Sequence, residues 1–395
     1  MTKFKSILHS AGFTNAASSV FAIFVGLIFG FIIMIVSNSK EALQGLGIIL
    51  QGGFGGGAKG VGQTFYYAIP IIMTGLSVGF AFKTGLFNIG ASGQFTVGAF
   101  TAILIGIKWT FLPAPWHWIV ALIGSAVAGG LWALIPGLFK AYLNVNEVIS
   151  CIMMNYIGLF GVNFAMKHAA FKGAPPLFDS TMNLSSNTSA SAVIPKGFLA
   201  ALFPNSTVNI GILIAIGIAV LVYIVLNKTT FGYELKACGF NRNASRYAGI
   251  SEKRNIVLSM VIAGALSGLG GGLVYLSGAN GRRYKVVDVM LADGFAGIPI
   301  ALLGLSNPIG IIFAGIFIAY ITVGGEYLQR LDFAVEIIDI ITAAIIYFSA
   351  FALVFRTFVK KVLGTKDVLT IVETGNDTSD QSNKSPQASD KGGEA

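Results

Sequence analysis

The chain has 395 residues, of which 54% are hydrophobic and 11% are charged. Soluble domains carry about 25% charged residues, so this composition excludes an ordinary soluble protein and predicts an integral membrane protein. The formal charge of +9 does not indicate nucleic-acid binding, because the basic residues lie at the edges of apolar segments. With two distant cysteines and three histidines, the chain predicts neither a disulfide framework nor a metal site.

Apolar windows of about 18 or more residues predict ten transmembrane helices. The first apolar run is longer than the core of a secretory signal, so we interpret it as a retained span. The predicted fold class is an all-α membrane protein whose transmembrane domain covers residues 1–363. Its spans are expected near 16–37, 63–82, 89–107, 117–139, 147–165, 208–227, 256–277, 287–304, 308–325 and 335–358.

The distribution of lysine and arginine predicts how the spans are oriented. The loop at 228–255 holds six cations in 28 residues, whereas the long segment 166–207 on the opposite side holds three lysines. Because cytoplasmic loops carry the excess of positive charge, this loop and both termini are expected in the cytoplasm. Arg282, Arg283 and Lys285 fall on the outer side in this topology, against the rule.

The stretch 80–100, FAFKTGLFNIGASGQFTVGAF, interrupts two apolar runs with polar residues and glycines. Hydrocarbon cannot satisfy such groups, so they persist only against protein or a water-filled path. We therefore expect a broken helix near 80–95, and we assign Asn88, Ser92 and Gln94 to the substrate pathway. The alternative is a cytoplasmic turn between two ordinary spans, with Asn88 as a helix cap.

Asn155 is a second polar candidate, in the fifth predicted span. It lies nine residues beyond Asn146, which at 1.5 Å per residue places it about 13 Å into the membrane. An unpaired amide at that depth is costly, so Asn155 should face either a neighbouring helix or the substrate pathway.

The loop at 231–255 is too long and too polar for a simple turn. We expect a short helix at 233–238, a break at Gly239 and a second short helix at 243–248. Two short helices that expose cations and small residues form a docking surface. The alternative is a solvated loop that only follows the distribution of positive charge.

Acidic residues keep a different class of protein open. Asp288, Asp293, Glu336 and Asp339 lie within or at the ends of predicted spans. Glu336 and Asp339 are three residues apart and share a helical face, as a proton relay would require. Both lie within a turn or two of the external end of their span, so solvation at the membrane interface is the simpler explanation.

Two polar segments carry no assigned function. Residues 181–191, MNLSSNTSASA, form a low-complexity stretch in the long external loop. Residues 364–395 lose hydrophobicity, and we expect them to form a disordered cytoplasmic tail.

Several motifs resemble those of bacterial ABC import permeases for simple sugars and nucleosides. The family's coupling segment, Arg-Ala-x-Gly-x-Asn-x-x-Ala followed by Gly-Ile, is similar to Lys236 to Ala244 with Gly249 and Ile250. Lysine at 236 and asparagine at 243 replace the usual arginine and proline. The segments GLFNIGASGQ (85–94), NEVISCIMMNYI (146–157) and GFAGIPIALLGLSNPIG (294–310) also resemble family signatures. The resemblance assigns ATPase coupling to Glu234, Lys236, Ala237, Gly239, Asn241, Arg242, Ala244 and Gly249.

This resemblance covers roughly residues 60–350 and implies a permease subunit, not an enzyme, with no cofactor. No phosphate-binding Gly-x-x-x-x-Gly-Lys-Ser/Thr motif occurs in the sequence, so ATP would be hydrolysed by a separate ATPase subunit. The implied partners are that ATPase, a second permease subunit, identical or paralogous, an extracytoplasmic substrate-binding protein and membrane lipid.

The segment at 85–94 favours the nucleoside branch, of purine type, over a ribose-like sugar permease. A self-sufficient ion-coupled carrier is the alternative from another class. It would need inverted repeats and an acid at the midplane, where this sequence places amides.

Overall fold

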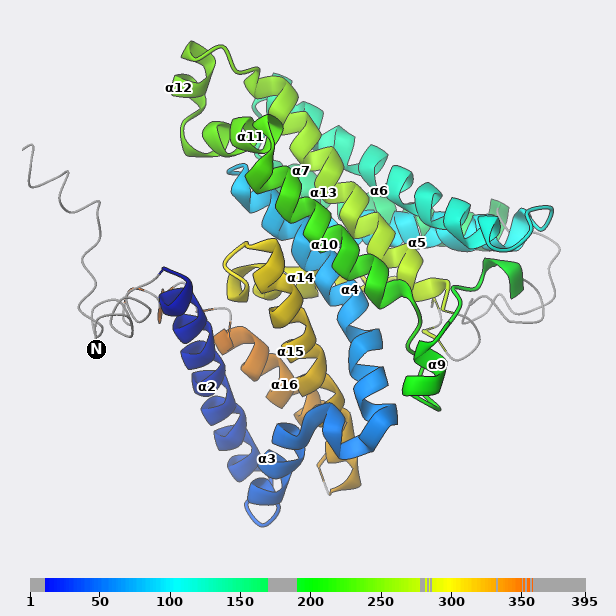
Figure 1. Cartoon of the computed structure of the whole chain (residues 1–395), viewed down its shortest axis with the longest axis vertical. Coiled ribbons are helices and arrows are strands. Elements are labelled where there is room, and N and C mark those ends of the chain that lie inside the picture. The colour runs from blue at the N-terminus through cyan, green and yellow to red at the C-terminus, as the bar shows by residue number, and fades with distance from the viewer. Residues whose placement is uncertain are drawn as a thin grey trace, which may run out of the picture.

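The computed structural model describes residues 11–169, 190–277, 281–282, 284, 286–331, 333–349, 351, 354–355 and 357. The regular elements of these residues are helices (Figure 1), which confirms the predicted all-α class. The helices are α2 (Ala11–Ser37), α3 (Ala42–Gln51), η1 (Gly52–Gly56), α4 (Gly57–Lys83), α5 (Ala91–Lys108), α6 (Trp116–Leu143), α7 (Glu147–Phe164), η2 (Ala165–Ala169), η4 (Ala190–Ala192), α9 (Leu199–Leu202), α10 (Gly211–Lys228), α11 (Thr230–Phe240), α12 (Arg242–Tyr247), α13 (Glu252–Tyr275), α14 (Ala292–Leu303), α15 (Pro308–Tyr327), η5 (Leu328–Arg330) and α16 (Val335–Ser349).

Eight stretches of helix in the described residues are long and apolar enough to cross a membrane, so the chain is a multi-pass membrane protein. They contain α2, α4, α5, α6, α7, α10, α13 and α15 and correspond to eight of the ten predicted spans. The segment predicted at 287–304 is helical only over the 12 residues of α14, about 18 Å at 1.5 Å per residue. The described part of the last predicted span is α16, of 15 residues.

Helix α3 was not predicted, because its ten residues fall below the length of a span. The chain turns from α3 into α4 through the glycines of η1 and the first residue of α4. Gly52 and Gly57 have φ values of +45° and +60°, which side chains rarely tolerate. Ile49 of α3 is fully buried beside Met34 of α2 and Leu328.

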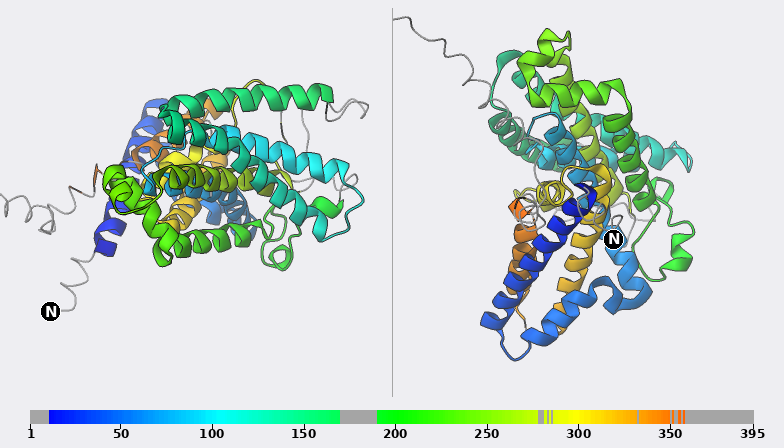
Figure 2. Two further views of the ribbon diagram at one scale, coloured as in Figure 1. Left: turned by 90° about the horizontal axis from the view of Figure 1, so that it is seen from above. Right: turned by 60° about the vertical axis from the view of Figure 1, so that its left-hand side comes forward.

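Helix α4 is the centre of the molecule. Every residue from 68 to 81 is buried, and α4 contacts α5, α10, α13, α14 and α15. On one side of α4 lie α2, α3, α15 and α16, and on the other lie α5, α6, α10 and α13 (Figures 1 and 2). Helices α11 and α12 project at one end of the molecule.

Helices α5, α6 and α13 pack at backbone contact through glycines. A Cβ added at Gly268 of α13 would lie 2.4 Å from the carbonyl oxygen of Ser125 in α6. A Cβ added at Gly98 of α5 would lie 2.4 Å from Gly268. Lipid provides no hydrophobic drive for helix association, so small residues that allow close approach hold this bundle together.

The structure does not describe several segments named in the sequence analysis. Residues 1–10, 170–189 and 358–395 lie outside the described residues, as do Arg283 and Lys285. The predicted cytoplasmic tail and most of the low-complexity stretch at 181–191 belong to these segments.

Candidate functional site

The stretch 80–95, where a broken helix was predicted, holds the connection between two separate helices that belong to two candidate membrane spans. Helix α4 ends at Lys83, α5 begins at Ala91, and residues 84–90 connect them without helix. Gly90, and not Asn88, occupies the position before the first turn of α5. Asn88 lies in this connection, and its side chain bonds both α4 and α5, as described next.

Asn88 and Gln94 form a reciprocal amide pair across this break. The Nδ2 atom of Asn88 donates to Oε1 of Gln94 at 2.8 Å, and Nε2 of Gln94 donates to Oδ1 of Asn88 at 2.9 Å. Asn88 also donates to the hydroxyl of Ser77, two turns before the end of α4, at 3.0 Å. Both amides are buried, with exposures of 0% and 1%.

Asn155 fastens α7 to the same break. Its Oδ1 accepts from the backbone N–H of Gly93 at 2.8 Å, and its Nδ2 donates to the carbonyl of Ile89 at 3.0 Å. A Cβ at Gly93 would lie 2.8 Å from the Cα of Asn155, so only glycine allows this approach. Asn88, Gln94 and Asn155 together are called the amide cluster below.

Ser92 lies beside the amide cluster at the start of α5. Its hydroxyl donates to the carbonyl of Leu291, just before α14, at 3.0 Å. A Cβ at Gly294 would lie 2.2 Å from the Cα of Ser92, so the first turns of α5 and α14 touch. The structure thus brings all four predicted pathway residues to one place, and each is buried and hydrogen-bonded within the protein.

The predicted coupling loop forms α11 and α12, here called the coupling surface. Each helix begins at a side-chain cap. Thr229 Oγ1 accepts from Gly232 N–H at 3.1 Å, and Asn241 Oδ1 accepts from Ala244 N–H at 3.0 Å. The predicted break at Gly239 is wrong, because α11 continues to Phe240 and the chain turns at Asn241. Asn241 competes with the helix by capping α12, which sequence reasoning at the glycine missed.

A groove of about 580 Å³ lies between the two short helices. Phe240, which lines the groove, and Tyr247 of α12 expose 92% and 94% of their surface, although both carry large aromatic rings. Exposed aromatic residues of this kind are typical of an interaction site. The residues lining the groove are Thr230, Tyr233, Glu234, Ala237, Phe240, Asn241, Ala244, Ser245, Ala248 and Ile250.

The other predicted coupling residues support or flank the groove. Glu234 accepts from Nδ2 of Asn255 at 3.3 Å, and Lys236 donates to Oδ1 of Asn227 at 3.4 Å. Gly249 follows the end of α12 by two residues and has a φ of +80°, and Arg242 is the first residue of α12.

Gly239 joins the coupling surface to the break. A Cβ there would lie 2.8 Å from the carbonyl carbon of Thr84 and 2.9 Å from the amide nitrogen of Gly85. Gly85 itself has a φ of +70° and faces Gly239 equally closely. Backbone therefore touches backbone between α11 and the segment that leads to the amide cluster.

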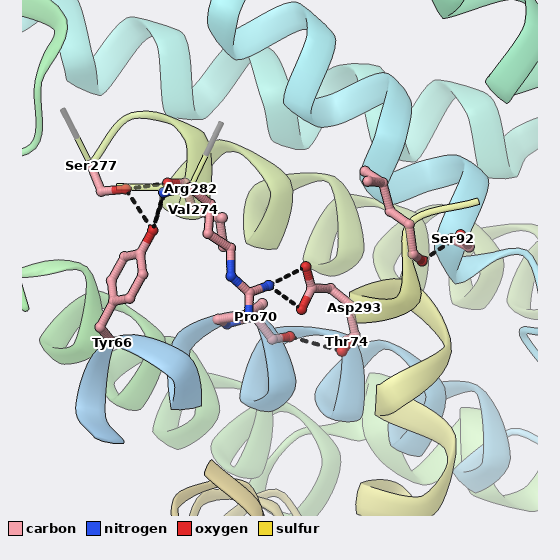
Figure 3. Close-up of polar contacts among 9 residues, drawn as sticks. Tyr66, Pro70, Thr74, Ser92, Val274, Ser277, Arg282 and Asp293 are labelled. Atoms are coloured by element: carbon pink, nitrogen blue, oxygen red, sulfur yellow. Dashed lines mark hydrogen bonds and ion pairs between the residues drawn. The ribbon is translucent and has the colours of Figure 1, made fainter. Parts of the chain in front are cut away.

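A further polar cluster was not predicted as a site. Figure 3 shows Arg282 between α4 and the start of α14, with Nη1 within 2.5 Å of both carboxylate oxygens of Asp293. The guanidinium lies 4.8 Å from the ring centre of Tyr67, and the Arg282 backbone N–H donates to the hydroxyl of Tyr66 at 2.9 Å. The signal in the sequence was a cation that violated the positive-inside rule, eleven residues before an acid in an apolar segment.

At the start of α4 lies a cavity of about 590 Å³, here called the outer cavity because the predicted topology places this end of α4 outside. The start of α4, the segment around residue 205 and the end of α15 surround it. Its lining residues are Lys59, Gln63, Lys196, Asn205, Ser206, Thr207, Glu326 and Tyr327. Glu336 and Asp339, considered for a proton relay, are both exposed on α16.

The described residues hold no group of three histidine, cysteine or acidic side chains that could bind a metal ion. Asp288 accepts a hydrogen bond from Asn163 Nδ2 at 3.0 Å. The geometry provides hydrogen-bonding groups, a cavity and an exposed groove, which suit passage and docking.

Residues 60–350 match the family described as the branched-chain amino acid transport system permease component. The chain is 36% identical to the nucleoside ABC transporter permease protein NupB of Lactococcus lactis, over 89% of this chain and 96% of that protein. It is 37% identical to the guanosine ABC transporter permease protein NupP of Bacillus subtilis, over 86% and 94% respectively. Identity to the glucose ABC transporter permease protein TsgB13 of Haloferax volcanii is 30%, over 73% and 75%. No solved structure matches the chain significantly.

Proposed function

The chain belongs to the permease components of the branched-chain amino acid transport family, and we propose that it carries nucleosides through the cytoplasmic membrane as one subunit of an ABC importer. The observation that carries this proposal is the similarity to two nucleoside-type permeases over almost the full length of all three chains. A simple-sugar permease is the second candidate, because a glucose permease is similar over three quarters of its length.

ATP hydrolysis belongs to a partner subunit in this proposal. The groove between α11 and α12 receives part of the ATPase, with Phe240 and Tyr247 as anchors. Their exposure supports this assignment, because exposing large aromatic side chains to water is unfavourable and a partner that covers them regains this free energy. Glu234, Lys236, Ala237, Asn241, Ala244 and Gly249 form or support the docking site.

A second permease subunit, identical or paralogous, and an extracytoplasmic binding protein complete the transporter. The coupling surface and both termini lie in the cytoplasm, because the six cations of residues 228–255 gather there. Cysteines introduced at Asn243 and Ala200, both exposed, test this orientation. An impermeant thiol reagent applied to intact cells should label position 200 and not position 243, and the reverse pattern would contradict it. The native Cys151 and Cys238 are buried, which keeps the background low.

The substrate route follows α4 from the outer cavity to the break. Asn88, Ser92, Gln94 and Asn155 form the inner closure of this route in the conformation described. The bonds of these amides within the protein support closure, because each amide oxygen and nitrogen of Asn88, Gln94 and Asn155 already has a partner. Movement at Gly239, driven by the ATPase, would separate these bonds and open the inner side.

Uptake of labelled nucleoside tests the function directly. Cells that produce the chain together with the ATPase, second permease and binding protein of its own transporter should accumulate purine nucleoside. Unlabelled purine nucleosides should compete more strongly than pyrimidine nucleosides, and ribose or glucose should not compete. Competition by sugar alone would overturn the nucleoside assignment in favour of the second candidate.

A further inference from the structure

One face of α4 is polar from its outer end to the level of the ion pair. Lys59, Gln63 and Tyr67 are spaced four residues apart, so their side chains lie above one another. Lys59 and Gln63 line the outer cavity. The hydroxyl of Tyr67 lies within hydrogen-bonding reach of Gln63 and of Glu326, which also lines the cavity. The inner end of this polar face is the guanidinium of Arg282 against the Tyr67 ring.

Arg282 contacts α4 well inside that helix, at Tyr67. Tyr67 is the eleventh residue of α4, about 15 Å from its outer end at 1.5 Å per residue. A charged side chain at such depth is costly, and residues of this kind are typical of substrate pathways. The side chain of Arg282 is nevertheless 33% exposed, against 17% for Asp293. Part of the arginine side chain is therefore accessible, although its guanidinium lies against Asp293 and the Tyr67 ring.

The ion pair uses only part of the guanidinium. In the part of the chain that the structure describes, both bonds to Asp293 leave from Nη1. A guanidinium has five N–H donors, and the parallel pair on Nε and Nη2 forms the fork that binds two acceptors side by side. Asp293 holds one nitrogen and Tyr67 covers one face, so the plane of this fork is fixed.

We propose that the Nε–Nη2 fork of Arg282 binds the adjacent O6 and N7 acceptors of a 6-oxopurine nucleoside on its way from the outer cavity. The inference rests on the proposed function and names the base class that the permease itself distinguishes. Arginine pairs in this two-bonded way with O6 and N7 of guanine. Adenine presents a donor at N6 in place of O6, which opposes one N–H of the fork.

Asp293 is a positioning residue in this site. It keeps its bonds to Nη1 while the base binds, so the ion pair need not break. The two acceptors satisfy donors that the acid does not reach. Loss of Asp293 would leave a partly buried, unpaired cation free to turn its fork away from the ligand.

The test compares guanosine with 7-deazaguanosine, which has a carbon in place of N7. Uptake of both is measured in cells with the complete transporter, for the wild-type chain and for Arg282→Lys. Lysine keeps the charge but has no planar fork. Because the binding protein is the same in both strains, any change in the selectivity ratio between strains belongs to the permease.

The wild-type ratio of guanosine to 7-deazaguanosine uptake should exceed the Arg282→Lys ratio by roughly tenfold, as loss of a two-bonded contact predicts. Asp293→Asn should lower the ratio in the same direction. The matched control is Asp288→Asn, which removes a nearby carboxylate that accepts from Asn163 and should leave the ratio unchanged.

A purely structural ion pair would lower the uptake of both nucleosides together, and an unchanged ratio in Arg282→Lys would overturn the proposal. If that variant does not reach the membrane, equilibrium dialysis of the purified wild-type transporter without binding protein decides instead. It should retain guanosine roughly tenfold more tightly than 7-deazaguanosine, and equal retention overturns the proposal. If wild-type cells accumulate no nucleoside at all, the proposed function fails first and separately.

Discussion

The amide cluster and the coupling surface are two polar regions that the structure treats in opposite ways. Asn88, Gln94 and Asn155 are buried, and they donate to and accept from one another and the adjacent backbone. Phe240 and Tyr247 are exposed on the coupling surface, where Phe240 lines a groove. The polar groups of the first region bond within the chain, whereas the aromatic side chains of the second region can be buried only by a partner.

This difference shows that a polar interruption in an apolar sequence can serve either folding stability or the binding of a partner. A buried amide whose groups are satisfied contributes to the fold, so its removal costs stability. An exposed aromatic residue contributes little to the fold, so its removal costs binding. Gly85 and Gly239 connect the two regions, since their backbones touch.

The largest effect is expected where the amide cluster is broken. Asn88→Ala strands the amide of Gln94 and the hydroxyl of Ser77 in a dry site. Each stranded group costs about 1–3 kcal/mol, so the total should be on the order of 3 kcal/mol of folding free energy. Thermal unfolding of the purified transporter and the yield of folded protein in detergent would measure it.

Asn227→Ala is the matched control for folding, because the two bonds of this exposed asparagine, to the Tyr223 carbonyl and from Lys236, lie at the surface. Its yield should equal that of the wild type. If Asn88→Ala folds normally and only uptake falls, Asn88 meets substrate more than it supports the fold.

The next effect concerns the contact between the two regions. Gly239→Ala places a Cβ within 3 Å of the backbone of residues 83–85, which no side-chain movement can relieve. Overpacking of this kind typically costs about 1–3 kcal/mol, and here it acts on the connection that moves. ATP-driven uptake should fall roughly tenfold while ATPase binding persists.

Gly217→Ala in α10 is the control for this substitution, because a Cβ there meets nothing within 4 Å. Uptake by the control should match the wild type. Wild-type uptake by Gly239→Ala would sink the idea that this contact carries the coupling.

Much of this comparison could be predicted from the sequence, and the rest could not for physical reasons. The apolar windows predicted eight spans that the structure confirms, because about 30 Å of hydrocarbon demands a recognisable length. The short α3 escapes that criterion, and α14 is shorter than the span predicted at 287–304. Polar residues at 88, 92, 94 and 155 were recognised as anomalous, but one sequence does not say which anomalies pair.

The ion pair of Arg282 and Asp293 was missed for the same reason. Its members are distant from Tyr66 and Tyr67 in sequence, and only the fold brings them together. The break between the coupling helices was misplaced by two residues, because the capping bond of Asn241 outweighs the flexibility of Gly239.

A smaller effect is expected at the exposed aromatic residues. Phe240→Ala removes a side chain that is 92% exposed, so the free energy of unfolding should stay within about 0.5 kcal/mol of the wild type. Affinity for the ATPase should fall by about 1–2 kcal/mol, as for an interface anchor. The loss is measured as the fraction of ATPase that co-purifies with the permease through washes of rising salt and detergent concentration.

The control is Phe54→Ala, because Phe54 is also exposed, at 71%, but lies in η1, far along the chain from the coupling surface. Equal ATPase recovery from both variants would mean that the groove is not the docking site.

The smallest effect is expected at Lys236, where the sequence departs from the arginine of related permeases. The Lys236 ammonium bonds Oδ1 of Asn227 at 3.4 Å on an exposed part of α11, which is a long contact in water. Such surface contacts are worth about 0–1 kcal/mol, so Lys236→Arg should change folding stability by less than can be resolved. Arginine would add a planar fork that can bind a carboxylate of the ATPase with two bonds, which lysine cannot do. ATPase affinity should therefore rise slightly, by at most about threefold, with uptake unchanged.

Lys228→Arg, at the end of α10, is the matched control and should change neither quantity. A large gain in affinity at position 236 would mean that the partner already presents an acid there, and that this side chain is an anchor equal to Phe240. A loss of ATPase affinity would mean that the docking site fits the compact ammonium of lysine. The lysine at 236 would then reflect an ATPase surface that differs from the one that an arginine fits.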